Sequence, residues 1–445
     1  MSKGNERGLH ELYRNDPERA DAVVFGRRTG FGRRGFMKGG LATMAAVLGG
    51  AIPFADRMPG GLLPAALAQT PAAPAAPPGP EYLTMDGKAR LVVLQDRPLN
   101  AETPAHLLND DVTPSANVFI RNHGKVPESV DTKAWKLTID GEVNSTLTLS
   151  LDELQKRFPV VKRRLVLECA GNGRSSFVPE ASGNQWTVGA VAQPEWTGVR
   201  LADVLKAAGI KSSAVYTAHF GADQHLSGDP TKLTVSRGVP MAKALDESTM
   251  LVWAINGQPL HMQNGFPLRL LVPGWPGSCS QKWLTKITLR DREHDGPGMT
   301  GLSYKVPKAP IVPGSKADPA QFRIMDYMPV RSIITSVAHG AQLPTGTRSL
   351  AVNGHAWSMD KGIKQVDVSI DYGATWTKAD LTSAEGKFTW QNWKAGLKFP
   401  SDGYYEIWSR ATDSTGLAQP FAAANWNPSG YGANPVHRVA VLIKA

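Results

Sequence analysis

The sequence predicts a mixed α+β domain followed by a smaller all-β domain. Three observations lead to this fold class: short helical and strand-like segments between residues 135 and 272, a proline-rich break at residues 305–320, and purely strand-like segments beyond it. With 44 Gly and 33 Pro in 445 residues, the composition favours short strands and many turns over an all-helical fold. A chain of this length can bury a sizeable core without disulfide bonds.

The first 68 residues have the features of an export signal. Arg33 and Arg34 precede a short apolar run over residues 41–54, as in twin-arginine signals, and residues 66–68 form a small-residue cleavage site. The apolar run is shorter than the ~20 residues that span a bilayer. We therefore expect export to the periplasm by the twin-arginine route, a leader over residues 69–95, and no membrane anchor after cleavage.

The charge balance is mildly basic. Ten of the 49 Lys and Arg residues and six of the 39 Asp and Glu residues lie in the first 68 positions, so the cleaved chain carries a net charge of +6. An excess of this size suits an anionic substrate or an acidic protein partner. No basic run is interleaved with aromatic residues, so the sequence does not predict nucleic-acid binding.

Residues 96–310 are expected to form the α+β domain. Two short amphipathic helices are predicted at residues 151–158, with Ser150 as the N-cap, and at residues 201–208, ended by Gly209. Strands are predicted at residues 136–141, 250–255 and 268–272. The proline-rich residues 305–320 are expected to be a linker.

Residues 320–445 are expected to form the all-β domain. Residues 365–371 and 404–411 alternate between apolar and polar side chains, which is typical of strands with one buried face, and Tyr372-Gly373 predicts a turn after the first of them. About 120 residues with turns at short intervals predict an immunoglobulin-like sandwich.

The chain has only two cysteines, Cys169 and Cys279, and in an oxidising compartment they could form one structural disulfide. The local sequence favours another role for Cys169, which follows a predicted strand over residues 164–168 and precedes a glycine-rich break. Arg174 lies five residues further on, where it could favour the thiolate that metals bind. One thiolate cannot hold zinc tightly, and no second Cys or His has zinc spacing, so other ligands of a metal would have to come from a cofactor.

Four segments resemble, in the same order, the cofactor-binding segments of the sulfite oxidase family. They are residues 119–127 (FIRNHGKVP), 167–174 (LECAGNGR), 265–274 (GFPLRLLVPG) and 282–284 (KWL). Any one of these motifs would mean little, but four in order are specific. The resemblance covers the chain from about residue 81 to its end. It implies a sulfite-oxidase-type molybdopterin domain followed by a dimerisation domain.

The resemblance also implies a role for each matching residue. Cys169 matches the thiolate ligand of molybdenum, and Arg121 and Arg174 match two arginines that flank the substrate oxygens. Tyr304 and Trp186 match an active-site tyrosine and a pocket-wall tryptophan. The expected contacts to molybdopterin are Arg121, Asn122, His123, Asp223, Asn264, Arg269, Ser280, Gln281 and Lys282. Taken singly, His123, Arg269, Lys282 or Trp186 would be interpreted as ordinary structural residues.

The chemistry that the resemblance implies is oxidation of sulfite to sulfate at a molybdenum–molybdopterin centre. The sequence has no Cys-x-x-Cys-His haem-attachment motif, so we expect an external c-type cytochrome to accept the electrons. A homodimer is expected from the second domain.

Three departures from the family pattern resemble bacterial sulfite dehydrogenases. Asn264 stands where many members have His, Ser182 lies near the position of a pocket lysine, and residues 426–431 lack an arginine. Three other functions stay open. The chain could be the molybdenum subunit of a thiosulfate-oxidising complex, a periplasmic methionine-sulfoxide reductase, against which residues 322–445 argue, or a non-enzymatic binding module, which would leave the Cys169 segment without a purpose.

Overall fold

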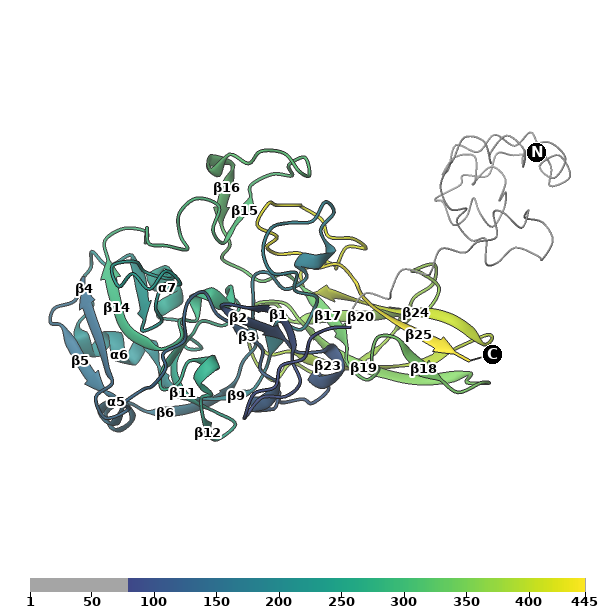
Figure 1. Ribbon diagram of the computed structural model, residues 1–445, viewed down its shortest axis with the longest axis horizontal. Coiled ribbons are helices and arrows are strands. Elements are labelled where there is room, and N and C mark those ends of the chain that lie inside the picture. Colours follow the sequence, from purple (N-terminus) through teal and green to yellow (C-terminus); the bar gives the residue numbers. More distant parts are fainter. Residues whose placement is uncertain (1–78, 445) are drawn as a thin grey trace, which may run out of the picture. The chain divides into compact units, whose positions relative to one another are not determined.

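A computed structural model describes residues 79–444 (Figure 1). The predicted signal, residues 1–68, and residues 69–78 of the predicted leader lie outside the described residues. The folded unit begins at Pro80, before the boundary expected at residue 96. Leu91 is fully buried and packs with Ala101 and Ile120, so the end of the predicted leader is part of the folded domain. No helix in this described part is long and apolar enough to cross a bilayer.

Two sheets form the framework of the α+β domain. The strands of the mixed sheet, in spatial order, are β10 (Tyr216–Gly221), β14 (Leu284–Arg290), β4 (Lys136–Gly141) and β5 (Leu147–Ser150). The strands of the antiparallel sheet, in spatial order, are β12 (Gln258–Pro259), β11 (Met250–Ile255), β9 (Glu195–Arg200) and β6 (Val160–Arg164), and β13 (Arg269–Leu271) also pairs with β11.

The smaller elements complete this domain. The short strands are β1 (Val92–Asp96), β2 (Leu99–Glu102), β3 (Ile120–Arg121), β7 (Leu167–Glu168), β8 (Val191–Ala192), β15 (Lys305–Pro307) and β16 (Phe322–Ile324). The α-helices are α5 (Leu151–Arg157), α6 (Leu201–Ala208) and α7 (Met241–Ala244). The 3-10 helices are η2 (Ala105–Leu108), η3 (Ser115–Asn117), η4 (Arg174–Ser176), η5 (Met262–Asn264), η6 (Gly277–Cys279) and η7 (Pro319–Gln321).

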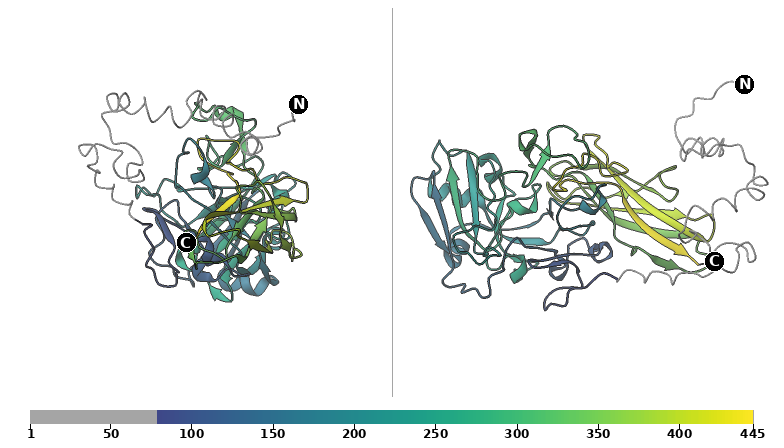
Figure 2. Two further views of the ribbon diagram at one scale, coloured as in Figure 1. Left: turned by 90° about the vertical axis from the view of Figure 1, so that its right-hand side faces the viewer. Right: turned by 45° about the horizontal axis from the view of Figure 1, so that its top comes forward.

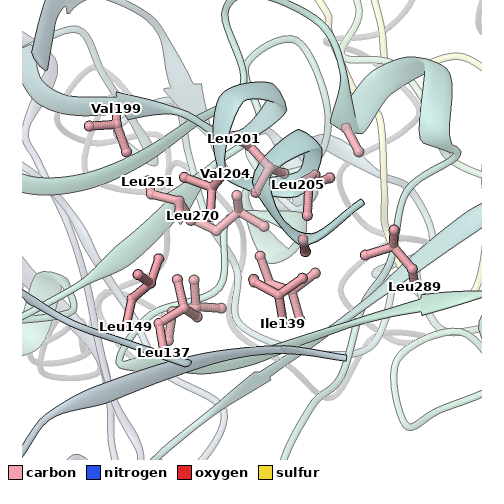
Figure 3. Packing of buried hydrophobic residues seen from close by; sticks show 14 of the residues in the cluster. Leu137, Ile139, Leu149, Val199, Leu201, Val204, Leu205, Leu251, Leu270 and Leu289 are labelled. Atoms are coloured by element: carbon pink, nitrogen blue, oxygen red, sulfur yellow. The ribbon is translucent and has the colours of Figure 1, made fainter. Parts of the chain in front are cut away.

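Local sequence explains both predicted helices, which are confirmed. Helix α5 starts with a capping box, because the Ser150 hydroxyl accepts from the Glu153 amide at 3.2 Å while the Glu153 carboxylate accepts from the Ser150 amide at 2.8 Å. Helix α6 ends at Gly209, whose φ of 74° is accessible without strain only to glycine. Figure 3 shows the apolar side chains of α6 facing those of β4 in the main core of the domain, with Leu201, Val204 and Leu205 opposite Leu137 and Ile139.

Two predictions for this domain are wrong in detail. The strand predicted at residues 164–168 is divided, since β6 ends at Arg164 and β7 begins at Leu167. The amide of the intervening Val166 donates to the carbonyl of Phe388 in the C-terminal domain at 2.8 Å instead of to a neighbouring strand. The predicted linker also holds a strand, because β15 pairs antiparallel with β16 over Lys305–Pro307.

The C-terminal domain consists of two sheets around one core. The first has the order β17 (Arg331–Ile334), β19 (Ser349–Trp357), β23 (Gln391–Lys398) and β22 (Asp380–Leu381). The second has the order β18 (Ala341–Leu343), β25 (His437–Ile443), β24 (Gly403–Asp413), β20 (Ile363–Ser369) and β21 (Thr377–Lys378). Strands β24 and β25 run side by side in Figures 1 and 2.

Side-chain alternation explains how this core is filled. Val366 and Val368 of β20, Ile407 and Ala411 of β24, and Val439 of β25 all belong to the buried cluster between the sheets. The predicted turn at Tyr372-Gly373 is confirmed, since both residues have positive φ, of 58° and 81°. The all-β character of the second domain is therefore confirmed.

Candidate active site

A cavity lies in the α+β domain, and most of the predicted site residues line it. We call it the Cys169 pocket. Its lining includes ten of them: Arg121, His123, Cys169, Asp223, Asn264, Arg269, Ser280, Gln281, Lys282 and Tyr304. These residues come from strands, turns and loops that are as much as 183 positions apart in sequence (Arg121 to Tyr304). The fold therefore brings the four sequence motifs together around one space.

Cys169 stands at the end of β7 with only 7% of its surface exposed. Its amide donates to the carbonyl of Ala190 at 2.9 Å, and its carbonyl accepts from the Asn172 amide at 3.0 Å, so the chain turns immediately after the thiol. Both cysteines are free thiols, and the alternative of a structural disulfide is therefore wrong. Cys279 is fully buried and has a cationic neighbour, because Nη2 of Arg237 lies 3.4 Å from its sulfur.

The pocket carries far more positive than negative charge. Arg121, Arg269 and Lys282 line it together with one carboxyl group, that of Asp223. Burial lowers the pKa of Arg269 to about 9. Burial also holds the pKa of Lys282 well below its usual value, and the neighbouring charge of Arg269 adds to this effect. Burial also raises the pKa of Asp223 to about 6. Such a concentration of poorly solvated cations is expected to attract an anionic group.

Unpaired polar atoms show that the pocket suits an anionic, hydrogen-bonding cofactor. Nε of Arg269, Oε1 of Gln281 and Oγ of Ser278 are buried without a hydrogen-bond partner in the protein. Buried polar atoms are normally paired, so these three are free to bind a ligand that has both donors and acceptors. A pterin bearing a phosphate has this chemistry, and Cys169 adds a soft thiolate for a metal. Among residues 79–444, no three His, Cys, Asp or Glu side chains are grouped as metal ligands.

Asn122 and Asn264 support the pocket in different ways. Asn122 is fully buried outside the lining, where its Oδ1 accepts from the Lys282 ammonium and its Nδ2 donates to Gln263 at 2.8 Å. Asn264, the residue that replaces a histidine of the family pattern, accepts from Lys88 at 3.0 Å. Burial lowers the pKa of Lys88 to about 7, so this half-buried lysine behind the pocket wall is only partly charged at neutral pH.

Tyr304 occupies the pocket in a strained conformation. Its φ of 51° is uncommon for a residue with a large side chain, and residues with such strained backbone angles occur mainly at functional sites. Its hydroxyl is hydrogen-bonded to Nε2 of His123, and its ring stacks on Tyr431 with centroids 5.0 Å apart. Burial holds the pKa of His123 well below its usual value, with Arg121 and Lys282 adding to the effect, so the imidazole is neutral. Burial raises the pKa of Tyr304, so the phenol keeps its proton.

The structure places Arg174 and Trp186 outside the lining of the pocket. The guanidinium of Arg174 donates to the carbonyls of Ser429 at 3.1 Å and Asn184 at 2.9 Å, and lies 5.4 Å from the ring of Tyr431. It therefore reaches the pocket only through Tyr431 and Tyr304. Trp186 is fully buried and packs in the cluster of apolar residues that contains Cys169.

Two residues of this region were not predicted from the sequence. Arg237 is fully buried, and its guanidinium carbon lies 4.7 Å from the centre of the Tyr304 ring. Tyr431, from the C-terminal domain, stacks on the same ring. Tyr431 lay in a segment noted only for its missing arginine, and Arg237 lies in no recognised motif. In the sequence, nothing distinguishes a buried arginine such as Arg237 from an arginine on the surface.

Comparisons with known proteins agree with this geometry. The family described as oxidoreductase molybdopterin binding domain matches residues 123–297, and the Mo-co oxidoreductase dimerisation domain matches residues 322–444. Sulfite oxidase of Gallus gallus is 33% identical over 379 residues, covering 82% of this chain and 81% of that protein. Mitochondrial sulfite oxidase of Mus musculus is 33% identical over 371 residues, covering 79% of this chain. The chain spans 66% of the length of that mouse protein.

A solved structure extends the similarity to three dimensions. The sulfane dehydrogenase SoxCD from Paracoccus pantotrophus has a TM-score of 0.68 and 26% identity, covering 85% of this chain and 96% of that one. Two family matches in the expected order, a relative similar over most of both chains, and a pocket with the matching thiol and cations lead to one conclusion. The chain belongs to the sulfite oxidase family of molybdenum-cofactor oxidoreductases.

Proposed function

We propose that this protein oxidises sulfite to sulfate with a molybdenum cofactor held in the Cys169 pocket. The observation that carries the proposal is the meeting of one nearly buried thiol with Arg121, Arg269 and Lys282 around a single cavity. Cys169 would bind the metal, and Arg269, Gln281 and Lys282 would hold the molybdopterin. When bound, the cofactor supplies a two-electron redox centre that transfers oxygen to sulfur. The overall change is sulfite and water to sulfate, two protons and two electrons.

The protein's own residues would bind and orient the oxyanion. Arg121 lines the pocket from β3 and is positioned by Asn100, whose Oδ1 accepts from its Nη1 at 3.3 Å. A planar guanidinium can bind two oxygens of sulfite at once and fix its orientation. The neutral His123 and the protonated Tyr304 add a hydrogen-bonding pair without a second charge. Arg174 would act indirectly, by holding Tyr431 against Tyr304.

Electron transfer and location complete the proposal. We propose a c-type cytochrome as the acceptor, because the two cysteines are 110 positions apart and cannot form a haem-attachment motif.

We propose the periplasm as the compartment on the basis of Arg33 and Arg34 in the N-terminal signal. Replacing both arginines with lysine and measuring where the protein accumulates tests the export route. Unchanged periplasmic delivery would contradict it.

A steady-state assay tests the activity. Molybdenum-loaded protein is mixed with sulfite and oxidised cytochrome c, and haem reduction is followed together with sulfate formation. We expect one sulfate for every two haems reduced, and none with Cys169→Ser. Sulfate formation that is independent of Cys169, or no sulfite oxidation by fully loaded protein, would contradict the proposal.

One observation favours a second function. The similarity in fold and sequence to the sulfane dehydrogenase SoxCD supports oxidation of sulfane sulfur as part of a thiosulfate-oxidising complex. The two functions differ in the sulfur that is oxidised, since a sulfane sulfur is bonded to another sulfur atom whereas the sulfur of sulfite is bonded only to oxygen. The same assay with a protein-bound persulfide in place of sulfite separates them. The substrate with the higher kcat/KM is the one for which the pocket is built.

We propose that the C-terminal domain is an immunoglobulin-like module that forms a homodimer. The match to a dimerisation domain supports this, and so does the outer face of the five-stranded sheet. Ile407 and Ala411 point into the core, so alternation directs Tyr404 outward, where it is 54% exposed beside its cross-strand partner Leu442, 41% exposed.

Analytical ultracentrifugation at micromolar concentration tests the dimer. Leu442→Asp should shift the protein toward monomer, whereas Val160→Asp, at a site that is 50% exposed in the other domain, should not. A wild-type monomer, or a dimer that Leu442→Asp leaves intact, would contradict this interface.

A further inference from the structure

A buried ion pair lies directly beside the cysteine of the pocket and connects it to the C-terminal domain. Glu168, the residue before Cys169, places Oε1 2.5 Å from Nε of Arg331 in β17. The two side chains are 1% and 3% exposed, so neither charge is solvated by water. Removing one partner of such a pair is strongly destabilising, because the other remains as an uncompensated buried charge.

The carboxylate of Glu168 has partners on both of its oxygens. Oε1 also accepts from Nδ2 of Asn172 at 3.0 Å, and Oε2 accepts from the indole Nε1 of Trp357 at 2.8 Å. Arg331 and Trp357 are directly opposite each other in the register of β17 and β19. One position on the C-terminal sheet therefore delivers both the cation and the indole donor to the residue that precedes the thiol.

Arg331 also reaches the backbone of the turn that follows the thiol. Its Nη2 donates to the carbonyl of Asn172 at 2.5 Å and to the carbonyl of Ala433 in the C-terminal domain. A further link between the domains is the amide of Gly432, which donates to the carbonyl of Ala170 at 3.0 Å. The turn after Cys169 is thus hydrogen-bonded to the second domain at Ala170 and at Asn172.

Gly173 shows how closely the two domains approach at this turn. Its φ is +85°, and a Cβ at this position would lie 2.5 Å from the carbonyl oxygen of Ala433 and 3.1 Å from Nη1 of Arg331. Only glycine allows both the backbone conformation and the contact. The segment Glu168–Gly173 is therefore fixed at its start, in its middle and at its end by groups of the C-terminal domain.

We propose that Arg331 and Trp357 are positioning residues that hold the Cys169 thiol in the orientation required of a metal ligand. The C-terminal domain then has two roles, as the dimerisation module and as the support of the ligand segment. The inference rests on the proposed function only in taking Cys169 as the metal ligand. Its contacts are all within one chain and do not depend on the identity of the substrate.

A purely structural role would give a different set of results, and the chain offers a matched control. Arg164 forms ion pairs of 3.1 Å with Asp111 and with Glu385 of the C-terminal domain, but its side chain is 37% exposed. The pair of Arg164 and Glu385 also joins the two domains, yet it does not contact the residues around Cys169. Arg164→Met therefore removes a connection between the domains without loosening the thiol.

The first measurement uses cofactor-free, full-length protein and does not depend on activity. Alkylation of Cys169 by iodoacetamide is followed by mass spectrometry of its peptide. In Arg331→Met and Trp357→Phe the rate should rise by about fivefold or more, the factor that corresponds to about 1 kcal/mol in a local opening equilibrium. In Arg164→Met it should stay within about twofold of wild type, a difference below 0.5 kcal/mol by the same relation. Equal rates in all four proteins would overturn the proposal.

A double variant separates positioning from stability. Glu168→Gln combined with Arg331→Met leaves no unpaired buried charge, so much of the stability lost in Arg331→Met should return. The carbonyl of Asn172 still lacks its donor, so fast alkylation should persist. Recovery of both stability and slow alkylation would show that the pair only stabilises the fold and would overturn the proposal.

The second measurement uses the molybdenum-loaded protein. The electron paramagnetic resonance spectrum of the half-reduced protein reports the geometry around the metal. It should change in Trp357→Phe, which removes a single donor and is the variant least expected to unfold, and should match wild type in Arg164→Met. A Trp357→Phe spectrum identical to wild type, with unchanged alkylation, would contradict the positioning role. If the variants show the expected changes in alkylation rate and in the spectrum but the loaded wild-type protein does not oxidise sulfite, the result counts against the proposed function and not against the positioning role.

Discussion

Replacing Arg269 with methionine should stabilise the cofactor-free protein while preventing it from retaining its cofactor. Arg269 is 5% exposed, forms no ion pair with any acid among the described residues, and has a pKa lowered to about 9 by burial. Because the folded pKa lies below the unfolded value of 12.5, the charged form is disfavoured in the folded state. The resulting destabilisation is complete below pH 9 and disappears only as the pH rises through the interval between the two values.

The magnitude follows from this difference and from one hydrogen bond. At ~1.36 kcal/mol per pKa unit, the burial of the charge destabilises the fold by at most about 5 kcal/mol. Methionine removes that destabilisation but also the bond from Nη1 of Arg269 to the carbonyl of Asn264 at 3.1 Å. A hydrogen bond from a charged donor contributes about 1.5–3 kcal/mol, which leaves a net gain of roughly 2–3 kcal/mol. For a domain of this size the melting temperature should rise by roughly 4–6 °C.

Thermal unfolding of cofactor-free protein, followed by circular dichroism at pH 7, measures this gain. Arg292→Met is the control, because that side chain is 67% exposed and its removal should change stability by less than about 0.5 kcal/mol. Molybdenum and pterin contents of the same variants, expressed with cofactor supply, measure retention. A cofactor-free Arg269→Met protein that melts at or below the wild-type temperature, or one that retains full cofactor, would refute the reasoning.

Three further predictions concern the thiol, the arginines and a buried histidine. Cys169→Ser should fold, and titration in denaturant without reductant should find one thiol in it against two in wild type. The variant should retain no molybdenum, because a hydroxyl is a poor ligand for a soft metal site. Arg121→Gln should weaken sulfite binding by roughly 1.5–3 kcal/mol, which raises the KM for sulfite and the inhibition constant for sulfate. Arg174→Gln should change both constants less, since the side chain of Arg174 does not line the pocket, and equal effects of the two substitutions would contradict this. His219 is fully buried with its pKa lowered to about 3, so its stabilising contribution is complete above pH 6.5 and is lost as the pH falls. In urea unfolding at pH 7 and pH 5, the loss of stability in His219→Gln should be smaller than in wild type by roughly 2 kcal/mol, the share of this histidine, and an identical loss in both proteins would contradict this.

Local patterns predicted the elements whose causes are local. Helix α5 was predicted from Ser150 and the apolar spacing after it, and its capping box depends on residues three positions apart. Strand β11 was predicted with its observed bounds, because a run of apolar residues flanked by polar ones is visible in the sequence. The pairing of β15 with β16 was not, since proline-rich segments suggest a linker and the partner strand begins only after a further 14 residues.

Resemblance predicted which residue types form the site, but not where each side chain points. Ten of the predicted residues line the Cys169 pocket, and five of them, Arg121, His123, Cys169, Arg269 and Lys282, belong to the four motifs. Arg174 is directed to the carbonyls of Ser429 and Asn184 by contacts with a segment more than 240 positions away, at Ser429. Arg331, 163 positions after Glu168, could not be linked to Cys169 without knowing how the two domains meet.

Two sets of buried charges lie around Cys169, the Glu168–Arg331 pair and the cations Arg269 and Lys282. Before the cofactor binds, they have opposite effects on the stability of the protein. The pair of Glu168 and Arg331 is neutral as a whole and satisfied by its neighbours, so it fixes the ligand segment in the cofactor-free protein. Arg269 and Lys282 form no ion pair with an acid among the described residues, and burial disfavours their charged forms until an anion enters. The protein therefore holds its thiol ready while leaving the surrounding cations unsatisfied, and the free energy released when an anionic cofactor satisfies them adds to the stability of the loaded form. Cofactor loading and thermal stability should accordingly rise together, and the increase should depend on the cofactor's negative charge.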